Sequence, residues 1–302
     1  MYIQWFPGHM TKAVRMMKDN VAICDALIYV VDSRAVLSSI NPVLEELTLG
    51  KPVLYVFNKS DLVQDRELKD WCARFDMEGR RYVTTVGTVA EQKHIIEGIK
   101  SLVAPMLLKY SQKGATKSIR VMVIGVPNSG KSTLINSMRR KASAQTGDRP
   151  GVTKGKQWLS LDKQIDLLDT PGTLWGKFEN QEIARHLAYI GSIKDDVLDV
   201  EGLAVEFINE FKEKAPSAFL DRYGVDIANI DAHEAFLKIA EKRGFKIKGG
   251  EIDYNRCAKT ILDDFRKGKL GKIMLEKAFD DKEEKGRLVI KRKESETKPL
   301  DK

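Results

Sequence analysis

Asn58-Lys59-Ser60-Asp61 precedes Gly125-Val126-Pro127-Asn128-Ser129-Gly130-Lys131-Ser132 in this chain, and the order of the two stretches decides the fold. The tetrapeptide has the form of a motif that recognises guanine. The octapeptide has the form GxxxxGK[ST] of a loop that binds phosphates. In the ordinary arrangement of such a domain, the phosphate loop comes first. Either one of the two matches is accidental, or the domain is circularly permuted.

The sequence around these motifs predicts an α/β fold. Apolar runs rich in β-branched and aromatic residues predict buried parallel strands, and the amphipathic stretches between them predict helices. Strands are expected at 26–32, 52–58, 80–85, 119–125 and 165–169, an edge strand at 157–161 in a hairpin with the last of these, and helices at 9–23, 41–49, 64–76, 89–109 and 131–140. This alternation predicts a doubly wound, mostly parallel sheet whose ligands bind at the carboxyl ends of the strands.

The strand pattern stops after residue 178, and amphipathic helices are expected at 181–191, 197–213, 232–243 and 255–268. We therefore expect three parts: a circularly permuted P-loop domain over 1–178, an all-helical domain over 179–285, and a basic, flexible tail over 286–302. Residues 179–234 contain 5 Lys and Arg and 13 Asp and Glu, whereas residues 235–302 contain 20 and 13. This clustered positive charge favours a polyanionic partner such as RNA.

Composition narrows the class of protein. The 302 residues are 42% hydrophobic and 31% charged, as in soluble globular proteins. The longest apolar run, Ala26 to Val31, is far shorter than the roughly 20 residues of a membrane span. Three widely separated cysteines argue against a disulfide framework or a zinc site. We therefore expect a cytoplasmic protein that does not associate with membranes.

The octapeptide carries the chemistry expected of a phosphate site, because an apolar strand precedes it and a helix follows it. Backbone N–H groups of the loop and the positive end of the helix can hold phosphate oxygens. We expect contacts from Pro127, Asn128, Ser129, Gly130, Lys131, Ser132 and Thr133. Lys131 would span the β- and γ-phosphates, and Ser132 would ligate Mg²⁺. A phosphate loop alone does not separate ATP from GTP.

The tetrapeptide supplies that discrimination. Asp61 can accept two hydrogen bonds from guanine, whereas adenine would leave this carboxylate buried without a partner. Asn58 would contact the base edge or brace the phosphate loop, and the stem of Lys59 would cover one face of the ring. Backbone N–H groups near Thr84 and Thr85, after the third strand, would approach the guanine O6.

Two further stretches predict a sensor of the γ-phosphate. Asp169-Thr170-Pro171-Gly172 follows an apolar strand, so Asp169 is expected to reach Mg²⁺ through water and the Gly172 N–H to reach the γ-phosphate. Between the phosphate loop and this sensor lies a Gly- and Pro-containing loop. Thr153 in that loop is the candidate for a second Mg²⁺ ligand, and Thr146 is its main rival.

These motifs, in the order base, base edge, phosphate, switch, sensor, resemble those of the circularly permuted GTPases. Together with Trp5-Phe6-Pro7-Gly8-His9-Met10, they resemble the ribosome biogenesis GTPase A family. The resemblance implies a GTPase that binds the large ribosomal subunit late in assembly, contacts ribosomal RNA through its basic C-terminal half, and leaves after hydrolysis. It implies GTP, GDP and Mg²⁺ as ligands, and we expect a monomer. Two alternatives remain: an RNA-binding GTP/GDP sensor without required turnover, and a GTPase of another process such as small-subunit maturation.

The catalytic water needs a partner that this sequence does not supply in the usual place. Ras-like enzymes have Gln directly after the sensor Gly, and here that residue is Thr173. His9 is the candidate, because it begins a helix in a segment made rigid by Trp5, Phe6 and Pro7, and because its pKa range suits water activation. Lys131 and Gly172 complete the expected catalytic set. The alternative to His9 is a group that the ribosome supplies in trans. Separately, the resemblance suggests a K⁺ ion beside Asn128, bridging the β- and γ-phosphates where an arginine finger would otherwise lie.

Overall fold

The computed structural model describes residues 1–89, 92–146, 158–162 and 164–279. Thr153 and the expected tail over 286–302 lie outside the described residues. In helix α6 the backbone of Thr146 is described, but its side chain is not. Within the described part of the chain, no helix is both long enough and apolar enough to span a membrane.

Six strands form one sheet with the spatial order β3-β2-β1-β4-β6-β5. The strands are β1 (Ala26–Asp32), β2 (Val53–Asn58), β3 (Arg81–Thr84), β4 (Ile119–Ile124), β5 (Trp158–Asp162) and β6 (Ile165–Asp169). All neighbours are parallel except the hairpin of β5 and β6. The chain runs outward from β1 to β3 and then returns to place β4 beside β1. This reversal makes the carboxyl ends of β1 and β4 the natural ligand site.

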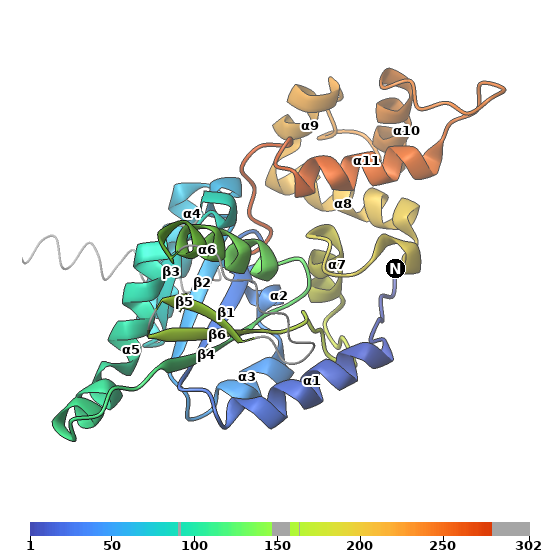
Figure 1. Ribbon diagram of the computed structural model, residues 1–302. Helices are drawn as coiled ribbons and strands as arrows, with labels where there is room; N and C mark the ends of the chain where they lie inside the picture. Colours follow the sequence, from blue (N-terminus) through green and yellow to red (C-terminus); the bar gives the residue numbers. More distant parts are fainter. Residues whose placement is uncertain (90–91, 147–157, 163, 280–302) are drawn as a thin grey trace, which may run out of the picture.

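Helices cover both faces of the sheet, so the predicted doubly wound architecture is confirmed (Figure 1). One face packs against α1 (Gly8–Val21), α3 (Pro42–Thr48) and α4 (Asp65–Met77), and the other against α5 (Gln92–Gln112) and α6 (Lys131–Thr146). Short helices lie at α2 (Val36–Ser39), Ser60–Leu62 and Gly87–Val89. Every residue of β1 is buried, as expected for a central strand between two helical layers.

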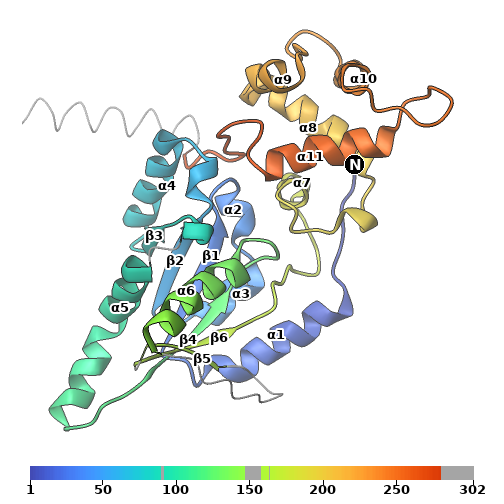
Figure 2. The same cartoon turned by 45° about the horizontal axis from the view of Figure 1, so that its top comes forward.

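The C-terminal region contains α7 (Gln181–Tyr189), a short turn at Asp195–Val197, α8 (Val200–Lys214), α9 (Pro216–Tyr223), α10 (Ala232–Lys242) and α11 (Tyr254–Arg266). The sequence patterns located four of these helices and missed α9. Pro216 occupies its first turn, where the missing N–H costs nothing, and Gly224 ends it with a φ of +68°. Helices α8 to α11 pack at one end of the sheet domain, and α7 lies between the two (Figure 2).

The two parts share one hydrophobic core. Ile3, Met10 and Val126 from the sheet domain, and Leu174 and Phe178 from the connection, belong to the same buried cluster as the side chains of α7 to α11. The expected boundary near residue 178 is therefore a change in architecture and not a gap in packing.

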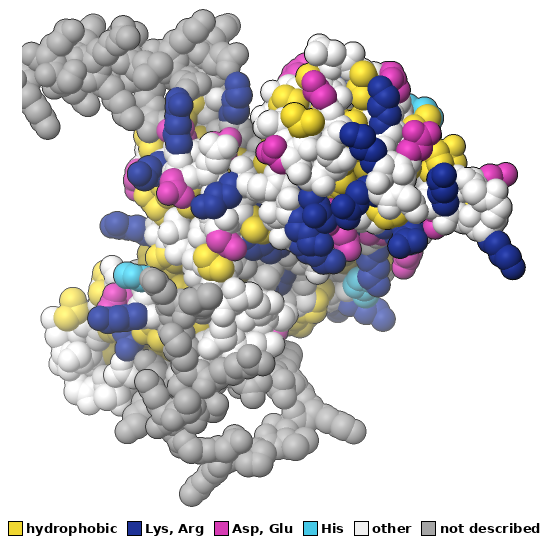
Figure 3. All heavy atoms as spheres, turned by 90° about the horizontal axis from the view of Figure 1, so that it is seen from above, with side chains coloured by type: hydrophobic (Ala, Val, Ile, Leu, Met, Phe, Trp, Pro, Cys, Tyr) yellow, Lys and Arg dark blue, Asp and Glu magenta, His cyan; other side chains and the backbone are white. Residues whose placement is uncertain are grey.

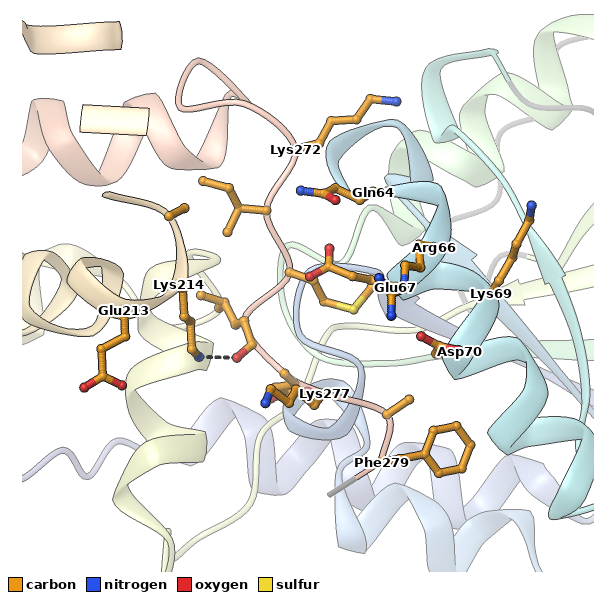
Figure 4. Close-up of a pocket in the computed structure, with 16 residues that line it drawn as sticks. Gln64, Arg66, Glu67, Lys69, Asp70, Glu213, Lys214, Lys272, Lys277 and Phe279 are labelled. Carbon is orange, nitrogen blue, oxygen red and sulfur yellow. Dashed lines mark hydrogen bonds between the residues drawn. The ribbon is translucent and has the colours of Figure 1, made fainter. Parts of the chain in front are cut away.

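The chain after α11 departs from the expected helical domain. Residues 270–279 return to the sheet domain without helix: the N–H of Ile273 donates to the Leu62 carbonyl at 3.0 Å, and that of Leu275 to the Arg34 carbonyl at 2.7 Å. Met274 and Ala278 are buried in the core beside α4. Three consecutive apolar side chains, Ile273, Met274 and Leu275, are buried in this stretch. Between this segment, the start of α4 and the end of α8 lies a cavity of about 940 Å³ (Figure 4).

Glu276 in this return segment joins three elements. Its carboxylate accepts from the N–H of Leu37 at 2.5 Å and of Ser38 at 3.1 Å, so it caps the start of α2 from a distant part of the chain. It also lies 3.0 Å from Nδ1 of His186, whose Nε2 lies 2.9 Å from Glu210 on α8. The buried His186 therefore bridges two carboxylates.

Candidate functional site

The predicted loops meet in a cavity of about 880 Å³ at the carboxyl ends of the strands. Its lining consists of Lys59, Pro127, Asn128, Gly130, Lys131, Ser132, Thr133, Ile135, Asn136, Leu159, Asp169, Thr170, Pro171 and Gly172. The slightly larger cavity of Figure 4 contains none of these motifs. We therefore assign the chemistry to the cavity at the strand ends.

The phosphate loop connects β4 to α6 and is braced by the guanine motif. Asn58 ends β2 and is 2% exposed; its Nδ2 donates to the Ser129 carbonyl at 2.8 Å, and its Oδ1 accepts from the N–H of Lys59 and of Gly87. Gly130 has a φ of +95°, and a β-carbon there would collide with the Asn58 amide. Of the two roles expected for Asn58, the geometry supports bracing.

The expected guanine contacts are partly available. Asp61 lies in the short helix Ser60–Leu62 and is exposed, so its carboxylate is open to a ligand. Thr84 is the exposed last residue of β3. Thr85 is buried, and its N–H already donates to the Phe57 carbonyl at 2.8 Å. This donor is therefore engaged and does not point to a base, contrary to expectation, because it continues the pairing of β3 with β2.

Lys131 is buried and directed into the loop. Its Nζ donates to the carbonyls of Gly125 at 3.0 Å and Val126 at 2.7 Å, positions that phosphate oxygens can take over. Burial lowers the pKa of Lys131 to about 8, with Asp169 opposing this effect and Lys59 adding to it. The ammonium still carries its charge at neutral pH.

The residues expected around Mg²⁺ fit that ion. Oδ1 of Asp169 is buried and has no hydrogen-bond partner among the described residues, and burial raises the pKa of its carboxyl. A water held by a divalent cation would satisfy this oxygen. Ser132 is exposed in the cavity lining at the start of α6. Hard oxygen donors of this kind are those that Mg²⁺ prefers.

Comparison with known proteins supports the same assignment. Residues 120–221 match the family model described as 50S ribosome-binding GTPase. The ribosome biogenesis GTPase A of Bacillus cereus is 41% identical over 278 residues, which cover 91% of this chain and 94% of the relative. The chain belongs to the ribosome biogenesis GTPase A family. Two solved structures of YlqF from T. maritima are similar in fold. The GNP-bound form has a TM-score of 0.65 and 26% sequence identity, and the match covers 89% of this chain and 99% of that chain. The GDP-bound form has a TM-score of 0.61 and 25% sequence identity, and the match covers 87% of this chain and 99% of that chain.

As a ribosome biogenesis GTPase A family member, the protein binds GTP and GDP and hydrolyses GTP. Thr173, which replaces the water-positioning Gln, is fully buried, and its Oγ1 has no hydrogen-bond partner among the described residues. Its N–H donates to the Gly125 carbonyl at 3.4 Å, and its carbonyl accepts from Nδ2 of Asn41. Thr173 therefore joins the sensor to the phosphate loop, and it is not among the described residues that line the cavity.

His9 is exposed in the first turn of α1. The centroids of the His9 and Trp5 rings lie 6.4 Å apart in an edge-to-face arrangement. His9 is absent from the described lining of the cavity, although the next residue, Met10, accepts through Sδ from the N–H of Leu174 at 3.5 Å. Helix α1 thus contacts the residues after the sensor through Met10, and His9 itself is not among the described residues that line the cavity. Its catalytic role stays a prediction.

The N-terminal segment of this GTPase runs along the connection between the sensor and α7. Gln4 donates to the Gly176 carbonyl and accepts from the N–H of Phe178, and the N–H of Ile3 donates to the side chain of Gln181. The sequence suggested a rigid segment here, and its partner is the chain that follows the sensor.

Sequence reasoning missed four residues beside the site. Gly191 and Ser192 follow α7 and touch the phosphate loop: Nδ2 of Asn128 donates to the Gly191 carbonyl at 2.5 Å, and Oγ of Ser192 donates to the Pro127 carbonyl at 2.7 Å. Asp32, the last residue of β1, forms a buried ion pair at 2.8 Å with Arg34, two residues further on. The only signal for Asp32 was its place at a strand end. No motif marked the other three.

Proposed function

We propose that this protein binds the large ribosomal subunit late in the maturation of that subunit, and that hydrolysis of GTP releases it. The matching family model is described as a 50S ribosome-binding GTPase, and the bacterial relatives are named for ribosome biogenesis. We extend that ribosome association to this chain, with binding late in the maturation of the large subunit and release after GTP hydrolysis.

One observation carries the release step. The phosphate loop touches the helical region directly, through Asn128 with Gly191 and through Pro127 with Ser192. Val126 of the same loop is buried in the core of that region. A movement of the loop or sensor on loss of the γ-phosphate would therefore act on α7 without an intervening linker.

The basic end of the helical region is the proposed contact with ribosomal RNA. Residues 235–279 hold 12 Lys and Arg against 6 Asp and Glu. The exposed ones are Lys238, Lys242, Arg243, Lys246, Lys248, Arg256, Lys259, Lys267, Lys269, Lys272 and Lys277. Figure 3 shows Lys and Arg side chains gathered on one face of this region. Such a surface gains affinity for a phosphate backbone by releasing counterions, so binding should weaken as salt rises.

Mg²⁺, K⁺ and a group that positions the attacking water would complete the catalytic site. Mg²⁺ would be held by Ser132 and, through water, by Asp169, with Thr153 as a further ligand; when bound, it offsets charge on the phosphates. Asn128 donates through Nδ2 to Gly191, so its Oδ1 is the atom that would ligate K⁺. His9 or a ribosomal group would position the water.

Sedimentation through sucrose gradients tests the function. We expect the protein to travel with isolated large subunits in a non-hydrolysable GTP analogue and to remain near the top in GDP, because the γ-phosphate fixes the sensor against the phosphate loop. Small subunits and an ATP analogue serve as controls.

Two outcomes would contradict the proposal and point to its alternatives. Equal binding to large subunits in both nucleotides favours an RNA-binding sensor in which turnover is not required. Nucleotide-dependent binding to small subunits alone favours a role in small-subunit maturation.

A further inference from the structure

A buried carboxylate lies directly behind the guanine motif. Asp32 ends β1 opposite Asn58 in the parallel register and is fully buried. Its Oδ2 accepts from Nζ of Lys59 at 2.6 Å and from Nη2 of Arg34 at 2.8 Å, and its Oδ1 accepts from Nε of Arg34 at 2.9 Å. Burial alone would raise the pKa of Asp32, but Arg34 and Lys59 hold it well below its usual range. Asp32 is therefore an anion between two cations.

Lys59 is the residue whose stem is expected to cover the guanine ring, and its geometry is fixed from two sides. Its backbone has a left-handed φ of +59°, and its Nζ also donates to the Asn128 carbonyl at 2.7 Å. A free lysine side chain loses rotamer entropy when it is immobilised. Because Asp32 holds the ammonium before nucleotide arrives, that cost does not fall on binding.

Arg34 extends the same cluster to the helical region. It is 1% exposed, its Nη1 donates to the carbonyls of Phe265 at 3.3 Å and Arg266 at 3.1 Å, and its guanidinium lies 5.1 Å from the Phe265 ring. These carbonyls end α11. Arg266 in turn donates to the carbonyls of Ala188 and Tyr189 at the end of α7. The chain of contacts thus runs from the base site to the ends of two helices.

We propose that Asp32 is a positioning residue for guanine-nucleotide binding, and that Arg34 makes this binding depend on the docking of α11. Asp32 touches no ligand itself and acts through Lys59. By thermodynamic linkage, whatever loosens the α11 contact weakens the nucleotide, and nucleotide strengthens that contact by the same factor. This coupling acts through Lys59, Asp32 and Arg34, in addition to the contact of the phosphate loop with the residues after α7.

Binding of GDP and of inorganic pyrophosphate, both with Mg²⁺, tests the positioning role, because pyrophosphate occupies the phosphate loop without a base. In Asp32→Asn we expect the Kd of GDP to rise at least about tenfold. The Kd of pyrophosphate should change less than about threefold. Asp25→Asn is the matched control: Asp25 precedes the same strand at its other end and pairs with Lys117 there. Equal weakening of both ligands, or no weakening of GDP, would overturn the positioning role.

Arg34→Gln tests the link to α11 and should also weaken GDP selectively. If the two residues act through one network, the double variant Asp32→Asn/Arg34→Gln should weaken GDP by much less than the product of the single effects. The double variant also removes both buried charges of the pair, so it remains informative where a single change leaves an unpaired charge and unfolds the protein. Unchanged GDP affinity in a folded Arg34→Gln, or a double variant that multiplies the single effects, would overturn the link.

Discussion

Gly172→Ala is expected to lower kcat/KM for GTP by at least about 100-fold, the cost of misplacing one donor to a developing charge. A β-carbon at residue 172 would lie 2.6 Å from Cα and 2.7 Å from N of Pro127, and 2.8 Å from Nζ of Lys131. The first two contacts involve backbone, which cannot turn aside as a side chain can. The sensor and the phosphate loop must separate, and the Gly172 N–H then loses its place at the γ-phosphate. Steady-state GTP hydrolysis measures the effect.

Gly176→Ala is the matched control, because it makes the same change in the same segment. The nearest atom to a β-carbon there is Cδ1 of Phe6 at 3.8 Å, an ordinary contact. We expect its turnover to stay within about twofold of the wild type, since surface substitutions without such a clash cost little. If Gly172→Ala and Gly176→Ala hydrolyse GTP equally well, the proposed contact of sensor and phosphate loop is wrong.

His186 is expected to make the free energy of unfolding fall by about 2 to 3 kcal/mol between pH 6.5 and 9.5. Burial disfavours the charged ring, but the hydrogen bonds that the ring donates to the carboxylates of Glu210 and Glu276 raise the pKa of His186 to about 9. A raised pKa contributes stability that is full below the unfolded value of 6.5 and is lost as pH rises through 9. The converse holds for Glu210. Burial would raise its pKa, but His186 and Lys214 outweigh burial and lower the pKa to about 2. The stability that Glu210 contributes is therefore lost only in acid.

Urea unfolding of wild type and His186→Asn across this pH range isolates the effect. The difference between the two proteins should be largest near pH 6.5 and shrink toward pH 9.5, because only the wild type loses the bridging proton. His233→Gln is the control, since His233 is exposed on α10. A wild-type-to-variant difference that does not change with pH would contradict the bridging role of His186.

The sheet and the phosphate site were predictable because their signals are local. Strands β1 and β2 are apolar runs that end in a polar residue. The phosphate loop lies between an apolar strand and a helix that begins at Lys131, where phosphate binding requires it. The positions of Asn58 and Asp169 at strand ends follow from the same pattern. The comparisons confirm the fold and the GTPase activity that these patterns predicted.

Contacts between distant parts of the chain could not be read in this way. Asp32 and Arg34 acquire their partners only when β1 lies beside β2 and the end of α11 reaches Arg34. Gly191 and Ser192 act only because α7 ends at the phosphate loop. The return of residues 270–279 to the sheet domain depends on apolar side chains whose partners lie about 200 positions earlier, such as Trp71, which donates to the Glu276 carbonyl. The hydrophobic periodicity of a segment identifies which face of the helix or strand is buried, but not which other segment packs against that face.

Amide hydrogen exchange of residues 186–193 tests most directly the central claim, that the phosphate loop and the helical region respond together to the γ-phosphate. We expect these amides to exchange at different rates with GDP and with a non-hydrolysable GTP analogue, and Ser192→Ala to reduce that difference by removing the bond to Pro127. Exchange that is the same with both nucleotides, while amides of the phosphate loop itself differ, would contradict the claim.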